Sequence, residues 1–180
     1  RLAEPEFSDK TSTASEEKQK IAQAAFNLVK PSDSIFLDGG STTMSLASLL
    51  HGMNNITVVT NSMKVAEMFS VSGPRVIIVG GELRRRSQTV VGPLTRYILE
   101  HIHVDTAFMG TIGVSDEAGM TTTDPHEAFT KELVISHADN VVLLADSSKL
   151  GKVSFVRFGG MQNIDALITD SGISQKDIRK

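Results

Sequence analysis

Residues 34–43, with the sequence SIFLDGGSTT, decide the fold of this chain. The apolar run from Ile35 to Leu37 predicts a short buried strand, and Gly39 with Gly40 predicts a sharp turn after it. Residues 44–50 continue with a helical pattern. The stretch is therefore a strand, a turn and a helix in succession, which is the opening of a parallel β-α-β unit.

The same unit recurs along the chain. Apolar runs of strand length occupy residues 56–60, 76–79, 104–109, 141–145 and 164–168, and helical patterns occupy 15–29, 65–69, 94–99 and 127–138. Strands that are nearly all apolar are buried on both faces, so the alternation predicts an α/β doubly wound domain with a mostly parallel sheet. Residues 82–91 fit a hairpin or a loop, and residues 120–123 fit a loop or an edge strand. No internal domain boundary is visible.

Composition narrows the class of protein. The chain has 180 residues, 40% of them hydrophobic and 22% charged, which is typical of one globular domain. A net charge of −3 lacks the basic balance of a self-sufficient nucleic-acid binder. The absence of cysteine excludes disulfides, thiol nucleophiles and cysteine zinc sites. No apolar run reaches the ~18 residues of a membrane span.

The N-terminal segment differs from the rest. Residues 1–14 are polar and turn-prone, so we interpret them as an arm or linker remnant, and residues 15–180 as the domain itself. The segment has no apolar core, which is unlike a signal peptide. It also lacks an initiator methionine, so we expect a piece of a longer chain.

Polar residues follow the predicted strands. In open parallel sheets, ligands bind outside the carboxyl ends of the strands, so we expect these residues to line one crevice. They are residues 38–43, 60–62, 80–82, 110–113 and 146–149.

Two of these segments suggest phosphate and sugar recognition. Gly39 and Gly40 let backbone N–H groups approach a ligand, and Ser41, with Thr42 or Thr43, can cap a helix whose N-terminus attracts phosphate. A plain strand-to-helix turn needs the same residues, and neither a Walker loop nor a GxGxxG fingerprint is present.

In the second segment, Asp146 can accept hydrogen bonds from sugar hydroxyls and Lys149 can hold phosphate, or the two form a local ion pair. Other charged residues have simpler interpretations. Glu127 and Lys131 have the i, i+4 spacing of a surface pair, and Lys18 is most simply a solvated side chain. Residues 84–86 are three arginines beside a turn, which are usually solvent-facing or paired with acids. The five histidines show no metal-ligand spacing.

The motifs nevertheless form one ordered set. They are KxxIA at 18–22, LDGGSTT at 37–43, VVTNS at 58–62, GGELR at 80–84, VG at 91–92, DTAFMGTIGV at 105–114, ExxxK at 127–131 and ADSSKLGK at 145–152. This order closely resembles the C-terminal effector-sensing domain of the DeoR family of bacterial transcriptional regulators, over residues 15–172.

The resemblance implies a Rossmann-like three-layer fold of the ribose-phosphate isomerase and CoA-transferase type. It implies a cytoplasmic repressor that binds a phosphorylated sugar or related metabolite here and forms dimers or tetramers. It also implies operator DNA contacts through an N-terminal winged helix-turn-helix, a segment that we expect to be missing from this chain. We expect no cofactor.

The resemblance also implies a set of ligand-binding residues. The phosphate cradle corresponds to Gly40–Thr43, with Asp38 at the sugar end, and Lys18, Glu82 and Glu127 are further candidates. The implied set is Asp38, Gly39, Gly40, Ser41, Thr42, Thr43, Thr60, Asn61, Gly80, Gly81, Gly110, Gly113, Lys131, Asp146 and Lys149.

Two other functions fit the same fold. A sugar-phosphate isomerase needs a general base, for which Asp38, Glu82 or Asp146 are candidates, but the acidic–glycine motif of such enzymes is not found. The other alternative to the sensor is an oligomerisation module with a vestigial pocket. The sequence favours the sensor and leaves the effector open among fructose, galactitol, tagatose, deoxyribose and glycerol phosphates.

Overall fold

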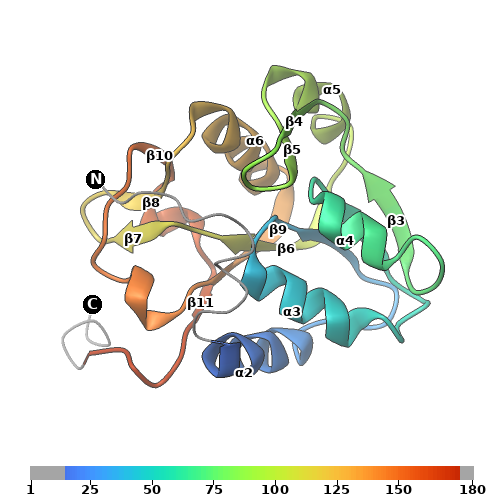
Figure 1. Ribbon diagram of the computed structural model, residues 1–180, viewed down its shortest axis with the longest axis horizontal. Helices are drawn as coiled ribbons and strands as arrows, with labels where there is room; N and C mark the ends of the chain where they lie inside the picture. Colours follow the sequence, from blue (N-terminus) through green and yellow to red (C-terminus); the bar gives the residue numbers. More distant parts are fainter. Residues whose placement is uncertain (1–14, 175–180) are drawn as a thin grey trace.

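The computed structural model describes residues 15–174, so the predicted arm at 1–14 lies outside the described residues. Its centre is a six-stranded parallel sheet with helices on both faces (Figure 1). The predicted α/β doubly wound fold is confirmed. In spatial order the strands are β3 (Arg75–Ile78), β2 (Thr57–Thr60), β1 (Ser34–Leu37), β6 (Val104–Gly110), β9 (Ala138–Leu144) and β11 (Ala166–Ile168).

The strand order reverses in the middle of the sheet. From β1 the chain moves outward through β2 to β3, and then returns to the other side of β1 with β6, β9 and β11. In such sheets a crevice forms between the two strands from which the chain departs in opposite directions. Here those strands are β1 and β6.

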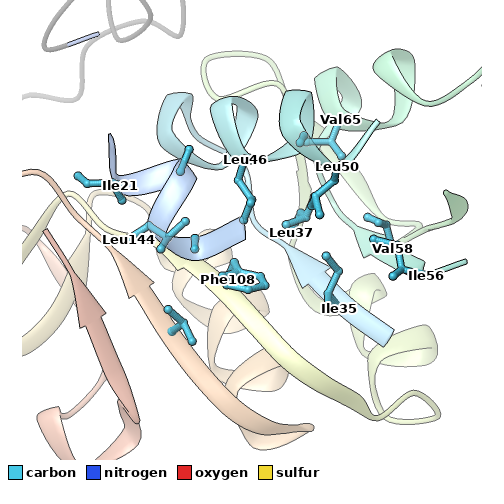
Figure 2. Close-up of a cluster of buried hydrophobic side chains, with 14 of the residues drawn as sticks. Ile21, Ile35, Leu37, Leu46, Leu50, Ile56, Val58, Val65, Phe108 and Leu144 are labelled. Atoms are coloured by element: carbon cyan, nitrogen blue, oxygen red, sulfur yellow. The ribbon is translucent and has the colours of Figure 1, made fainter. Parts of the chain in front are cut away.

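One face of the sheet is covered by three helices: α2 (Ser15–Phe26), α3 (Ser41–Leu50) and α4 (Met63–Met68). Successive strand residues point to opposite faces, so Ile35 and Leu37 pack with Leu46 of α3 in this layer (Figure 2). Phe36, between them, belongs to the opposite core. Burial on both faces is why these strands are continuous apolar runs rather than alternating ones.

The other face is covered by α6 (Pro125–Ser136), with η1 (Pro93–Thr95) and α5 (Arg96–Leu99) beside it (Figure 1). Two small sheets complete the molecule. A hairpin joins β4 (Glu82–Arg84) to β5 (Thr89–Val91), which resolves the open choice at 82–91. The second sheet has the order β10-β8-β7, formed by β7 (Gly113–Ser115), β8 (Gly119–Thr122) and β10 (Val156–Gly159).

Two expectations about the strands are wrong. Residues 119–122 form the central strand of the small sheet, not a loop or an edge, because β10 and β7 flank them. Strand β3 is not buried on both faces: it is the edge of the large sheet, and Ile78 is 50% exposed. Short 3-10 turns, η2 (Ser147–Lys149) and η3 (Met161–Asn163), follow β9 and β10.

Candidate functional site

The carboxyl ends of β1 and β6 meet at the reversal of strand order. Asp38 follows β1, and its backbone N–H donates to Phe108 O of β6 at 3.1 Å. The backbone N–H of Gly110 donates to Asp38 Oδ2 at 2.9 Å. The Asp38 carboxylate is therefore fixed at the reversal of strand order, which is where sheets of this kind generally bind ligands.

The turn after Asp38 is shaped by its neighbours. A Cβ on Gly39 would lie 2.0 Å from Thr89 Cγ2, so the passage of β5 directly over the turn requires glycine there. Gly40 has φ +154° and occupies the N-cap of α3.

No side chain of the described residues caps α3. The expected cap by Ser41, Thr42 or Thr43 is therefore wrong, because these residues form the first turn itself. The hydroxyl of Thr43 instead donates to Gly40 O at 2.9 Å. The first backbone bond of the helix is Met44 N–H to Gly40 O, so the preceding N–H groups have no partner within the helix.

Helix α6 presents two buried charges to this turn. Lys131 donates to Gly110 O at 2.9 Å and forms an ion pair with Asp38 Oδ2. Glu127 lies one turn earlier and is also buried. The expected surface pair between them is wrong: among residues 15–174, each is bonded to other elements instead, because this face of α6 packs onto the sheet.

The partner of Glu127 is Arg84, the first of the three arginines for which we expected either a solvent-facing position or a pair with acids. Arg84 Nη1 lies 3.3 Å from Glu127 Oε1, and Arg84 Nε lies 3.4 Å from Asp124 Oδ2. Thr122 of β8 donates to Glu127 Oε2 at 3.0 Å. The side chain of Arg84 is only 18% exposed, whereas its neighbours Arg85 and Arg86 are exposed. These contacts join the β4–β5 hairpin to α6.

Thr60 and Asn61 lie at the end of β2, and their side chains tie the chain together. Thr60 Oγ1 donates to Leu37 O at 2.7 Å. Asn61 Nδ2 donates to Val90 O at 3.0 Å, and the backbone N–H of Val90 returns a bond to Asn61 O at 2.7 Å. These bonds hold β1 and β5 beside the turn. The other side-chain atom of the amide, Asn61 Oδ1, is buried with no hydrogen-bond partner in the described residues.

Two of the other glycines, Gly81 and Gly113, are explained by packing of the chain on itself. A Cβ on Gly81 would lie 2.9 Å from Val90 Cγ1, and one on Gly113 would lie 2.5 Å from Lys152 O. On Gly110, a Cβ would make only an ordinary 3.5 Å contact with Asp38 Oδ2. Gly80 and Glu82 are exposed at the start of the hairpin.

Asp146 and Lys149 lie after β9, at the same edge of the sheet. Asp146 accepts a hydrogen bond from the Ser148 backbone N–H at 3.1 Å and contacts the Ser148 hydroxyl, so it caps η2. Asp170 anchors the same turn by accepting from the Ser147 N–H at 2.7 Å. Burial raises the pKa of Asp170, but hydrogen bonds from Ser147 and Gly172 outweigh it and leave the pKa below its usual value.

The local Asp146–Lys149 ion pair is not formed, and Lys149 is half-buried with no ion-pair partner among residues 15–174. Lys18 is buried on α2, contrary to the solvated side chain that we expected.

The geometry can now be compared with known proteins. A family model described as the DeoR C-terminal sensor domain matches residues 13–171. The chain belongs to the DeoR family. The family and the sensor role predicted from the ordered motifs are therefore confirmed, and a ligand-sensing regulatory role follows.

Curated relatives of this DeoR sensor domain are transcriptional regulators. The chain is 39% identical over 155 residues to the HTH-type transcriptional regulator GlpR of Haloferax volcanii, matching 86% of this chain and 61% of that protein. It is 35% identical to the HTH-type transcriptional regulator GolR of Listeria innocua, matching 97% and 69%. It is 31% identical to the glycerol-3-phosphate regulon repressor of Escherichia coli, matching 91% and 65%.

The chain thus spans 61% to 69% of the length of these three relatives. Because they are named as regulators and the matched family is a sensor domain, the expectation of a regulator rather than an isomerase is confirmed.

Solved structures share the fold. Ribose 5-phosphate isomerase A of Methanocaldococcus jannaschii has a TM-score of 0.57 at 20% identity, covering 77% of this chain and 55% of that one. The eIF2B delta subunit of Chaetomium thermophilum has a TM-score of 0.57 at 11% identity, covering 87% and 56%. At these identities the likeness concerns the fold alone, which agrees with the fold that the resemblance implied.

Two negative findings concern the described part of the DeoR sensor domain. Between residues 15 and 174, no cluster of three histidines or carboxylates is arranged to hold a metal ion. Within the same range, no helix is both long and apolar enough to cross a membrane.

Proposed function

We propose that the crevice at the ends of β1 and β6 binds a phosphorylated sugar or polyol, and that this ligand controls DNA binding by the whole protein. The observation that supports this most directly is the first turn of α3, whose N–H groups have no partner within the helix and no side-chain cap from the described residues. Such a turn attracts an anion. Asp38, beside it, supplies an acceptor for hydroxyl groups.

The positions of the other predicted residues support the same ligand class. Lys149 has no ion-pair partner in the described part of the chain and lies after a strand at the same edge of the sheet, so it is a candidate for the phosphate. Asp146 is a candidate for a sugar hydroxyl through the carboxylate oxygen that does not cap η2. A curated relative is named for glycerol-3-phosphate, which belongs to this class of compounds.

The regulatory mechanism that we propose is a shift between two states of an oligomer. In it, the whole protein is a cytoplasmic dimer or tetramer. It contacts operator DNA through a helix-turn-helix, which is the motif that the names of two relatives contain. The ligand binds one state better than the other and changes the geometry of the DNA-binding segments. The shift is limited by the difference between the two affinities.

Thermal denaturation with a panel of compounds tests the ligand class. The panel holds the phosphates of glycerol, fructose, galactitol, tagatose and deoxyribose beside their unphosphorylated parents. A ligand at 100 times its Kd adds about 2.7 kcal/mol of stability, which raises Tm by several degrees. A shift with one or two phosphates and none with the parents is expected, and no shift with any phosphate contradicts the proposal.

Substitutions then test the residues. Lys149→Ala should weaken binding of the phosphorylated compound much more than binding of its parent, whereas Asp146→Ala should reduce discrimination among sugar epimers. Lys152→Ala removes an exposed lysine three residues further on and is the matched control. Equal weakening of phosphate and parent by Lys149→Ala would exclude a phosphate contact.

A further inference from the structure

The ammonium group of Lys131 is engaged by three neighbouring residues of the protein. Its side chain is 9% exposed. It donates to Gly110 O at 2.9 Å, it is paired with Asp38 Oδ2, and it lies 5.0 Å from the centre of the Phe158 ring. A lysine has three N–H donors, and here two carry hydrogen bonds while the ammonium also lies over an aromatic ring. Lys131 is therefore satisfied within the protein.

The two oxygens of Asp38 have different surroundings. Oδ2 accepts from the Gly110 N–H at 2.9 Å and from Lys131. Oδ1 accepts no hydrogen bond from any residue of the described range 15–174. The fully buried side-chain atoms without a partner in that range are Asn61 Oδ1, Ser154 Oγ and Thr169 Oγ1. Asp38 Oδ1 is not among them, so this oxygen is not completely closed off from solvent.

The chemistry of that oxygen selects the ligand group that meets it. A carboxylate oxygen accepts hydrogen bonds and repels phosphate, so the group that approaches Asp38 Oδ1 is a hydroxyl. Hydrogen bonds to an ionised acceptor are stronger than those between neutral groups. The adjacent N-terminus of α3 favours negative charge and supports both the carboxylate and a phosphate bound further along the turn.

The two observations together assign different roles to the two residues. We infer that Lys131 is a positioning residue: it holds Asp38 Oδ2 so that Oδ1 accepts a hydrogen bond from a hydroxyl of the ligand, and it does not itself contact the ligand. This inference rests on the proposed function. It differs from the resemblance, which places Lys131 among the residues that contact the ligand.

Two further features support this division of roles. Gly110 uses both its N–H and its carbonyl to bind the pair, so β6 fixes the carboxylate and the ammonium at once. Phe158, on β10, is 1% exposed, and the Lys131 ammonium lies over its ring. The lysine is thus held by α6, β6 and β10, and it has little freedom to turn toward a ligand.

The test is a double-mutant cycle on ligand affinity. The variants are Asp38→Asn, Lys131→Met and the double substitution, with Lys64→Met as the control because Lys64 lies in a surface pair with Glu67. The probes are the phosphates of glycerol, fructose, galactitol, tagatose and deoxyribose, with inorganic phosphate as the probe without a carbon-bound hydroxyl. Affinities come from titration calorimetry, and circular dichroism confirms that each variant is folded.

The inference predicts a specific pattern. Asp38→Asn and Lys131→Met each weaken binding of the polyol phosphate by about tenfold or more, since a hydrogen bond to a charged group is lost. Neither variant weakens binding of inorganic phosphate. The double variant binds as weakly as Asp38→Asn alone, because Lys131 acts only through Asp38. Lys64→Met binds like the wild type.

Two outcomes overturn the inference, and they differ from failure of the proposed function. In the first, the fold-losses of affinity in the two single variants multiply in the double variant. In the second, Lys131→Met weakens the binding of inorganic phosphate as much as the binding of the polyol phosphate. Either result would mean that Lys131 contacts the ligand itself. If Lys131→Met does not fold, Lys131→Arg replaces it in the cycle, and it should retain the hydroxyl preference that Asp38→Asn loses. If the wild type binds no phosphate of the panel, the proposed function fails first, and the inference falls with it.

Discussion

The contact between Gly39 and Thr89 allows a sharp prediction for Gly39→Ala. The new Cβ would lie 2.0 Å from Thr89 Cγ2, where carbon atoms are in comfortable contact at about 3.5–4.0 Å. The next nearest atom, Thr89 Cβ, lies at 3.5 Å and needs no adjustment. Gly39 is not in the left-handed region, so an alanine is not strained by its backbone angles. The loss of stability expected for Gly39→Ala therefore comes from the contact of the new Cβ with the Thr89 Cγ2 methyl group.

Thr89 cannot move aside without breaking other interactions. Its hydroxyl lies 2.7 Å from Ser87 Oγ and 3.4 Å from Glu127 Oε1, so rotation of the side chain breaks contacts of a buried network. Displacement of β5 would instead disturb its bonds to Asn61. Overpacking of this kind costs about 1–3 kcal/mol of unfolding free energy.

The second half of the prediction is a rescue. Thr89→Ser removes Cγ2 and keeps the hydroxyl, so it should cost little by itself, about 0.5–1.5 kcal/mol for one buried methyl group. Combined with Gly39→Ala, it should restore most of the loss. Gly52→Ala is the control, because a Cβ there has nothing within 4 Å.

Urea denaturation at constant protein concentration measures all four variants. We expect Gly39→Ala to lower the unfolding free energy clearly and Gly52→Ala to leave it unchanged. The double variant should be more stable than Gly39→Ala alone. If the losses from Gly39→Ala and Thr89→Ser simply add, the clash is not the cause, and the argument from the close approach of β5 is wrong.

Three further predictions concern stability. Asp124→Ala removes the side chain that caps α6 by accepting two backbone N–H groups and should cost about 0.5–2 kcal/mol in urea denaturation, whereas Glu117→Ala, at an exposed position, should be near neutral. Hydrogen bonds from the Ser34 hydroxyl and N–H lower the pKa of Asp105, so this stabilisation is present above the unfolded pKa, about 3.9, and is lost as pH falls through the folded pKa. Ser34→Ala should therefore flatten the acid side of a stability–pH curve; an unchanged slope would contradict this. Phe158→Ala removes a fully buried ring and should lower the unfolding free energy by about 3–5 kcal/mol, whereas a loss below 1 kcal/mol would show that the ring is not packed as described.

Much of the fold followed from local pattern. The runs such as Ile35 to Leu37 are apolar because both faces of their strands are covered, and that pattern predicts a parallel sheet without knowledge of any contact. The sequence also predicts the edge of the sheet at which a ligand is expected, because the carboxyl ends of parallel strands lie at one edge. The expected burial of β3 on both faces was wrong, because an apolar run does not reveal whether its strand lies at the edge of the sheet.

The charged residues were harder to predict. Glu127 and Lys131 have the spacing of a surface pair, and nothing local indicates that α6 turns that face inward. Arg84 stands in a run of three arginines, and the alternation of a short strand places it toward α6 while the turn carries its neighbours outward.

The sequence by itself thus determined the order of elements, the layers that they form, the family and the edge of the sheet at which a ligand is expected. Only the tertiary structure decided which charges meet. Lys131 and Asp38 are 93 positions apart in the chain, and Arg84 and Glu127 are 43 apart, so their pairing depends on how α6, the hairpin and β1 pack. Local propensity acts over a few residues, whereas these contacts arise from the burial of whole faces. The same packing explains Gly39, which the sequence assigned to a ligand and the structure places beneath Thr89.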